Sequence, residues 1–146
     1  MLASAYERGG YWEDACSEFR NILKLDPNNA EASNYLGYMF ADKGVNLDEA
    51  IELIDKALAA DPNNGAYIDS LGWAYFKKGM IDEALVQLER AVSLIGDDAV
   101  VRDHLGDVYL GKGMRDKAVS EWKRSLELDN SQGTVKEKIE KSSKSS

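Results

Sequence analysis

His104 is the residue best suited by type to acid–base or metal chemistry, because it is the only histidine in this chain of 146 residues. Asp103 and Asp107 flank it along the sequence, and carboxylates beside an imidazole are a common arrangement in such sites. One histidine and two carboxylates still lack the further Cys, the Ser partner or the glycine loop that these sites need. We therefore expect no catalytic residue, no metal site and no cofactor. We interpret His104 as either solvated or lining a groove.

The elements that must position these side chains repeat along the chain at a fixed period. Residues 70–92 read SLGWAYFKKGMIDEALVQLERAV, with a Leu-Gly pair, an aromatic residue and a later alanine. This pattern recurs at steps of 34 or 35 residues, with leucines at Leu2, Leu36, Leu71 and Leu105, aromatics at Tyr6, Phe40, Tyr75 and Tyr109, and alanines at Ala15, Ala50, Ala84 and Ala118. A repeat of this length predicts an all-α fold, an α-solenoid of stacked antiparallel helix pairs.

The repeat predicts a single domain over residues 1–141. Its units are an incomplete one at 1–29, complete ones at 30–64, 65–98 and 99–130, and a capping helix at about 131–141. Residues 142–146 should be disordered, since terminal residues are seldom held in place. The first unit lacks the beginning of its first helix, which suggests a chain cut from a longer array.

Turn residues mark where the units end. The sequence Asp-Pro-Asn-Asn at 26–29 and again at 61–64 predicts the end of a helix, because proline cannot continue one. Gly96 and Asn130 replace this proline in the next two units. The second unit has one extra residue between Phe40 and Ala50, and we place it in the turn at 44–47.

Composition excludes several classes of partner. The net charge is −8, and the four Lys and two Glu of residues 131–146 leave −10 on residues 1–130. Such an acidic body disfavours nucleic acid, which needs clustered Lys and Arg. The single Cys16 can form no internal disulfide. No run of residues is long and apolar enough for membrane insertion, and no signal peptide is recognisable. A cytoplasmic location is therefore the default, but the compartment stays open because the chain is expected to be a fragment of a longer protein.

This pattern resembles the tetratricopeptide repeat, a helix-turn-helix unit of about 34 residues with a Leu-Gly pair, an aromatic residue, two alanines and a closing proline. The resemblance covers residues 1–130, and the units agree in phase. It implies a right-handed superhelix whose first helices line a concave groove that binds peptides or extended partner segments. Co-chaperones of this family hold a carboxylate in the groove with Lys, Arg and Asn, but only Asn34 fits that requirement here.

Helical spacing nominates the residues of this groove. If Leu36 and Phe40 point inward, a separate stripe forms on each first helix. The stripe predicts a ligand-binding surface made of Asn34, Tyr38, Asp69, Trp73, Phe76, Asp103 and Asp107. Trp73, Tyr38 and Phe76 either pack against a neighbouring unit or anchor a ligand. The aspartates either lie on a solvated face or select a basic or amphipathic segment.

The leading hypothesis for function is a non-catalytic adaptor that binds a segment of another protein in its concave groove. A second hypothesis is a structural role, in which the chain forms a homo-oligomer through an N-terminal face that contains Leu2, Tyr6, Tyr11 and Trp12. A third is the regulatory arm of a larger enzyme. The sequence leaves the partner and the biological process open.

Overall fold

The computed structural model describes residues 11–144, and these residues form helices with no strand among them. The helices are α2 (Trp12–Leu25), α3 (Ala30–Lys43), α4 (Leu47–Ala60), α5 (Gly65–Lys77), α6 (Ile81–Ile95), α7 (Ala99–Gly111), α8 (Arg115–Leu128) and α9 (Gly133–Lys144). The all-α fold expected from the repeat is confirmed. α3, α5 and α7 begin at Ala30, Gly65 and Ala99, the first residues of the units read from the sequence.

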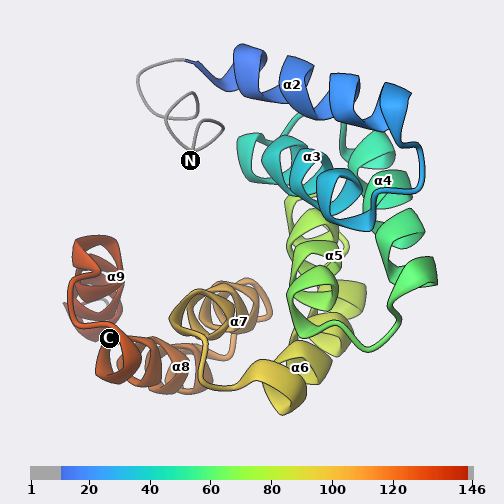
Figure 1. The fold of residues 1–146 in the computed structure, drawn as a ribbon. Helices are drawn as coiled ribbons and strands as arrows, with labels where there is room; N and C mark the ends of the chain where they lie inside the picture. The colour runs from blue at the N-terminus through green and yellow to red at the C-terminus, as the bar shows by residue number, and fades with distance from the viewer. Residues whose placement is uncertain (1–10, 145–146) are drawn as a thin grey trace.

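Figure 1 shows the helices arranged in an open arc of two rows. α3, α5 and α7 form the inner row, whereas α2, α4, α6 and α8 form the outer row. α9 follows α8 at the C-terminal end of the arc and packs against it. The apolar core lies between the two rows, and each helix contacts its neighbours along the array.

The residue directly before each inner helix accepts hydrogen bonds from backbone N–H groups through its side chain. Asn29 Oδ1 accepts from Ala32 N at 2.9 Å, and Asn64 Oδ1 accepts from Tyr67 N at 3.1 Å. Asp98 caps α7 in the same way, because its side chain accepts hydrogen bonds from two backbone N–H groups. These caps satisfy donors that the first helical turn leaves unpaired, so the turn sequences fix the start of each inner helix.

The turns inside the units contain residues with positive φ. Gly44, Gly79 and Gly113 have φ of 78°, 88° and 83°, a region that glycine enters without steric cost. In the second unit, Asn46 also has a positive φ, of 48°, between Gly44 and the start of α4. The extra residue of this unit therefore lies in the turn at 44–47, as expected.

Small residues bring the two helices of each unit close together. A Cβ atom added at Gly37 would lie 2.7 Å from Ile54 Cγ1 and 2.9 Å from the carbonyl oxygen of Ala50. A Cβ added at Gly72 would lie 2.7 Å from Leu88 Cγ. Gly106 is likewise covered by the indole of Trp122. These contacts explain why glycine follows the leucine of the Leu-Gly pair in each complete unit.

The two ends of the chain differ from the sequence prediction or lie outside the described residues. α9 continues to Lys144, so residues 142–144 are helical, and the expectation of a disordered tail from 142 onward is wrong for them. Ser142 is buried, which gives the helix a reason to continue beyond 141. Residues 145–146 and the expected first helix with Leu2 and Tyr6 lie outside the described part of the chain.

Candidate interaction surface

The seven residues predicted for the groove lie on three neighbouring inner helices. α3 contributes Asn34 and Tyr38; α5 contributes Asp69, Trp73 and Phe76; α7 contributes Asp103 and Asp107. We call the faces of α3, α5 and α7 that contain them the inner surface. Most of these side chains make contacts with another helix, and the contacts decide which of them remain open to a partner.

Trp73 is part of the packing between units. Its side chain is 7% exposed, and its Nε1 donates a hydrogen bond to Asp42 Oδ1 at 3.1 Å. The indole stacks on the ring of His104, with centroids 3.9 Å apart and planes at 15°. It also stacks on Phe76, which is half-buried against the core. These contacts favour the packing interpretation of Trp73 and Phe76 over that of exposed anchors.

His104 is buried rather than solvated, which corrects one of the two interpretations drawn from the sequence. It is 5% exposed, and its Nδ1 lies 2.9 Å from Asp69 Oδ1, so the pair joins α7 to α5. Burial alone lowers the pKa of His104, but the charge of Asp69 and the hydrogen bond to it, together with the charges of Asp103 and Asp107, outweigh burial. The pKa of His104 is therefore raised, which favours an imidazolium at this position.

Asp103 and Asp107 are paired with a lysine of α9. Lys138 Nζ lies 2.8 Å from Asp103 Oδ1 and 2.9 Å from Asp107 Oδ1. Each of the two aspartate side chains is only 18% exposed. Burial raises the pKa of Asp107 despite the nearby ammonium group, whereas hydrogen bonds to both carboxylates raise the pKa of Lys138 against the effect of burial. The two aspartates therefore do not form the solvated face considered from the sequence.

The contacts between units recur at fixed sequence separations. Asp69 and His104 are 35 residues apart, as are Asp103 and Lys138. Asp42 and Trp73 are 31 apart, as are Asp107 and Lys138. Sequence reasoning missed His104 and Lys138 as partners. A search for opposite charges one period further along the chain would have found them.

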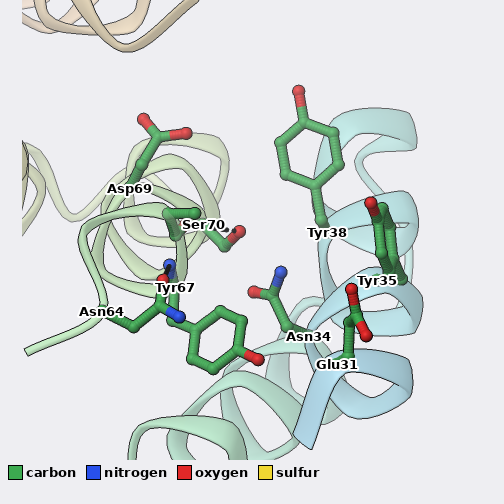
Figure 2. Close-up of a pocket in the computed structure, with 9 residues that line it drawn as sticks. Glu31, Asn34, Tyr35, Tyr38, Asn64, Tyr67, Asp69 and Ser70 are labelled. Carbon is green, nitrogen blue, oxygen red and sulfur yellow. Dashed lines mark hydrogen bonds between the residues drawn. The ribbon is translucent and has the colours of Figure 1, made fainter. Parts of the chain in front are cut away.

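A pocket opens on the inner surface between α3 and α5, with a volume of about 340 Å³. Figure 2 shows the side chain of Asn34 between Tyr67 of α5 and the tyrosines of α3. Glu31, Tyr38 and Asp69 also line the pocket. Two predicted residues of the α3 stripe and one of the α5 stripe therefore meet at one concave site.

Neither a metal-holding cluster nor a membrane-spanning helix is found among residues 11–144. No cluster of three or more His, Cys, Asp or Glu side chains within them could hold a metal ion. None of the described helices has both the length and the apolar character needed to cross a bilayer. The inner surface is thus an arrangement of aromatic, amide and carboxylate groups, which suits binding.

Comparisons with known proteins place this architecture in a family. Two family models described as tetratricopeptide repeat match residues 1–65 and 42–105. A TPR repeat-containing protein of Pseudomonas aeruginosa is 39% identical over 64 residues, which make up 44% of this chain and 11% of that protein. The chain thus matches a small part of the length of that relative.

Solved structures show the same fold over nearly the whole chain. A crystal structure of MamA is 26% identical, with a TM-score of 0.73, and the match covers 99% of this chain and 84% of MamA. PilF of Pseudomonas aeruginosa is 26% identical with a TM-score of 0.78, and the match covers 97% of this chain and 64% of PilF. With its phased units, its rows of paired helices and these matches, the chain belongs to the tetratricopeptide repeat family.

Proposed function

We propose that this chain is a non-catalytic scaffold that binds a basic or amphipathic segment of a partner protein on its inner surface. Tetratricopeptide repeats are protein–protein interaction modules, so the fold supports a scaffold in general. The observation that carries the finer proposal is the charge of the pocket between α3 and α5. Glu31 lines it with an exposed side chain, Asp69 lines it while paired with His104, and no Lys or Arg is among the described residues that do.

The contacts within the chain narrow the place where the partner binds. Asp103 and Asp107 are paired with Lys138, and Trp73 is covered by its neighbours, so these residues offer little new contact. Tyr38 and Asn34 line the pocket instead. We therefore place the partner against α3 and α5. The acidic body, with −10 on residues 1–130, attracts a basic segment from a distance.

A titration with matched peptides tests this proposal. The probes are two capped amphipathic peptides of equal length, one with Leu and Lys and the other with Leu and Glu, followed by isothermal titration calorimetry. We expect the basic peptide to bind, with an affinity that falls as salt rises, and the acidic peptide not to bind. Equal binding of both peptides, or of neither, would overturn the proposal.

Two charge reversals locate the contact. Glu31→Lys changes an exposed residue of the pocket, and Glu52→Lys makes the same change on an exposed residue of α4, in the outer row. The basic peptide should bind several-fold more weakly to the Glu31→Lys variant than to the Glu52→Lys variant. If the two variants lose affinity equally, the partner responds only to net charge, and the assignment to the inner surface fails.

Self-association is a second candidate, favoured by apolar side chains exposed on and beside α2. Tyr11 is 53% exposed, Ile22 39% and Leu25 90%, although Trp12 packs on Phe40. Exposed apolar groups of this kind can mark an interface. Sedimentation velocity over a concentration series distinguishes the candidates, because a chain that stays monomeric at high concentration does not self-associate. A concentration-dependent increase that Leu25→Ser abolishes would support self-association through α2.

A further inference from the structure

The pocket between α3 and α5 contains a buried hydrogen-bond acceptor with nothing to accept from. Asn34 as a whole residue is 9% exposed, and its Oδ1 has no hydrogen-bond partner among the described residues. Figure 2 shows this amide in the middle of the pocket. A buried acceptor without a donor costs free energy, which a ligand that supplies a donor would recover.

The position of Asn34 in the repeat explains why its acceptor has no donor. Asp69 stands at the equivalent position of the next unit and meets His104, and Asp103 stands one unit further and meets Lys138. In both cases, the residue 35 positions later supplies a donor. The residue 35 positions after Asn34 is Asp69, whose carboxylate is an acceptor already paired with His104. The helices that follow therefore supply a donor to Asp69 and to Asp103, but they supply none to Asn34.

The surroundings of Asn34 favour a cation. Glu31 lines the pocket, and Figure 2 shows the rings of Tyr67 and Tyr38 on two sides of the amide. Tyr35 also lines the pocket, with its ring stacked on Phe19. The pKa of Tyr67 is raised by burial and then by the charges of Glu31 and Asp61, which indicates a negative potential here. An anionic ligand would be repelled by these groups, whereas aromatic faces attract cations.

We propose that this pocket binds the guanidinium group of an arginine side chain from the partner segment. This proposal rests on the proposed function and specifies the group that is recognised. The guanidinium donates to Asn34 Oδ1 and to the carboxylate of Glu31 and lies against the tyrosine rings. Arginine fits better than lysine because its planar head carries five N–H donors, stacks on aromatic faces and is more weakly hydrated. A volume of about 340 Å³ leaves room for such a planar group.

Three capped hexapeptides test the proposal by calorimetry: hexa-arginine, hexa-lysine and hexa-citrulline. Citrulline has nearly the shape of arginine without its charge. We expect hexa-arginine to bind more tightly than hexa-lysine and hexa-citrulline to bind least. Asn34→Leu keeps the size of the side chain and removes the acceptor, so affinity for hexa-arginine should fall about tenfold while that for hexa-lysine changes less than about twofold. Glu52→Lys, on the outer row, serves as the control for net charge.

The outcomes separate this proposal from the proposed function. Suppose that hexa-arginine and hexa-lysine both bind the wild type. If Asn34→Leu then changes neither affinity, or changes both equally, the arginine pocket is wrong, whereas the proposed binding of basic segments on the inner surface still holds. If no basic peptide binds the wild type, both proposals fall. NMR of the wild type with acetyl-arginine amide gives a readout that does not depend on a variant. We expect the side-chain amide of Asn34 and the ring of Tyr67 to shift, and shifts confined to other residues would overturn the pocket.

Discussion

Trp73 joins two units of the array through its indole ring. Because Trp73 is 7% exposed, stacks on His104 and donates to Asp42, we expect Trp73→Ala to lower the free energy of unfolding by about 3–5 kcal/mol. Trp73→Phe should cost less, since it keeps an aromatic ring and loses only the hydrogen bond and part of the area. Urea unfolding measures both. Tyr35→Ala is the matched control, because Tyr35 is on the same inner row but 51% exposed; it loses the stacking on Phe19 and should cost about 1 kcal/mol. A Trp73→Ala variant with unchanged stability and weaker peptide binding would make Trp73 an anchor after all.

His104 should make stability depend on pH. Its pKa in the folded chain is raised above 6.5 by Asp69 of α5 and by Asp103 and Asp107 of its own helix. Asp103 and Asp107 also contact Lys138 of α9. The imidazolium thus contributes stability that is fully present below the unfolded pKa and is lost as pH rises through the folded pKa. Urea unfolding between pH 5.5 and 8.5 should show this loss, and His104→Gln should reduce it.

An NMR titration of the His104 ring protons gives the pKa directly. A value at or below 6.5 would contradict the prediction, because burial would then outweigh the carboxylates. Asp69→Asn is a useful comparison, since it removes the charge that lies nearest to the imidazole and keeps a side chain of the same size. The pKa of His104 should be lower in that variant than in the wild type.

The residues that could be predicted from the sequence are those whose partners lie within one unit. Gly37, Ala50 and Ile54 pack inside a single helix pair, so their spacing alone places them in the core. Asp69 and Trp73 were placed correctly on the inner helices, but their partners belong to neighbouring units. Those contacts depend on how one unit packs on the next, which helical spacing within a unit does not specify. The Asp69–His104 pair therefore could not be derived from helical spacing within a unit.

Helix pairs set a limit on side-chain size where they cross. A Cβ at Gly37 would lie 2.9 Å from the carbonyl oxygen of Ala50 and 2.7 Å from Ile54 Cγ1, so one helix must shift to admit it. We expect Gly37→Ala to cost about 1–3 kcal/mol in spite of the better helix propensity of alanine. Gly133→Ala is the control, because no atom lies within 4 Å of the added Cβ at the start of α9, and it should be neutral or slightly stabilising. Equal midpoints of urea unfolding for the two variants would show that the helix crossing accommodates the added methyl group without loss of stability.

The boundaries of the elements were predictable where local chemistry decides them. Asn29 and Asn64 follow the two Asp-Pro pairs and cap the next helix through their own side chains, so those boundaries depend on adjacent residues. The end of α9 is different. The polar sequence after 141 gave no reason to continue the helix, but Ser142 is buried in the folded chain. Its burial is a tertiary effect, and the helix therefore continues beyond the point that propensity indicates.

At the scale of the whole molecule, the array neutralises much of its own inner surface. His104 meets Asp69, and Lys138 meets Asp103 and Asp107, so the aspartates predicted to select a ligand also hold successive units together. Replacing one of these aspartates should lower stability, so an effect of such a variant on binding would be difficult to separate from the loss of a buried ion pair. The open acceptor at Asn34 and the exposed Glu31 lie outside this network of ion pairs, which makes them the better positions for a test of binding.

Deleting α9 should weaken the array from its C-terminal end inward. Val135 of α9 is fully buried against the cluster that contains Trp122 and Tyr109, and Lys138 is the cation for Asp103 and Asp107. In a solenoid, each unit is stabilised by its neighbours, so a chain that stops at residue 131 should lose hydrogen-exchange protection in α7 and α8 first. α3 and α4 lie at the other end of the arc from α9 (Figure 1) and should keep theirs. Hydrogen-exchange mass spectrometry measures this gradient.

Ile54→Ala, which empties a fully buried position in α4, should produce the reverse gradient, with protection lost first in α3 and α4. An even loss over all helices in both variants would show that the chain unfolds as one cooperative unit.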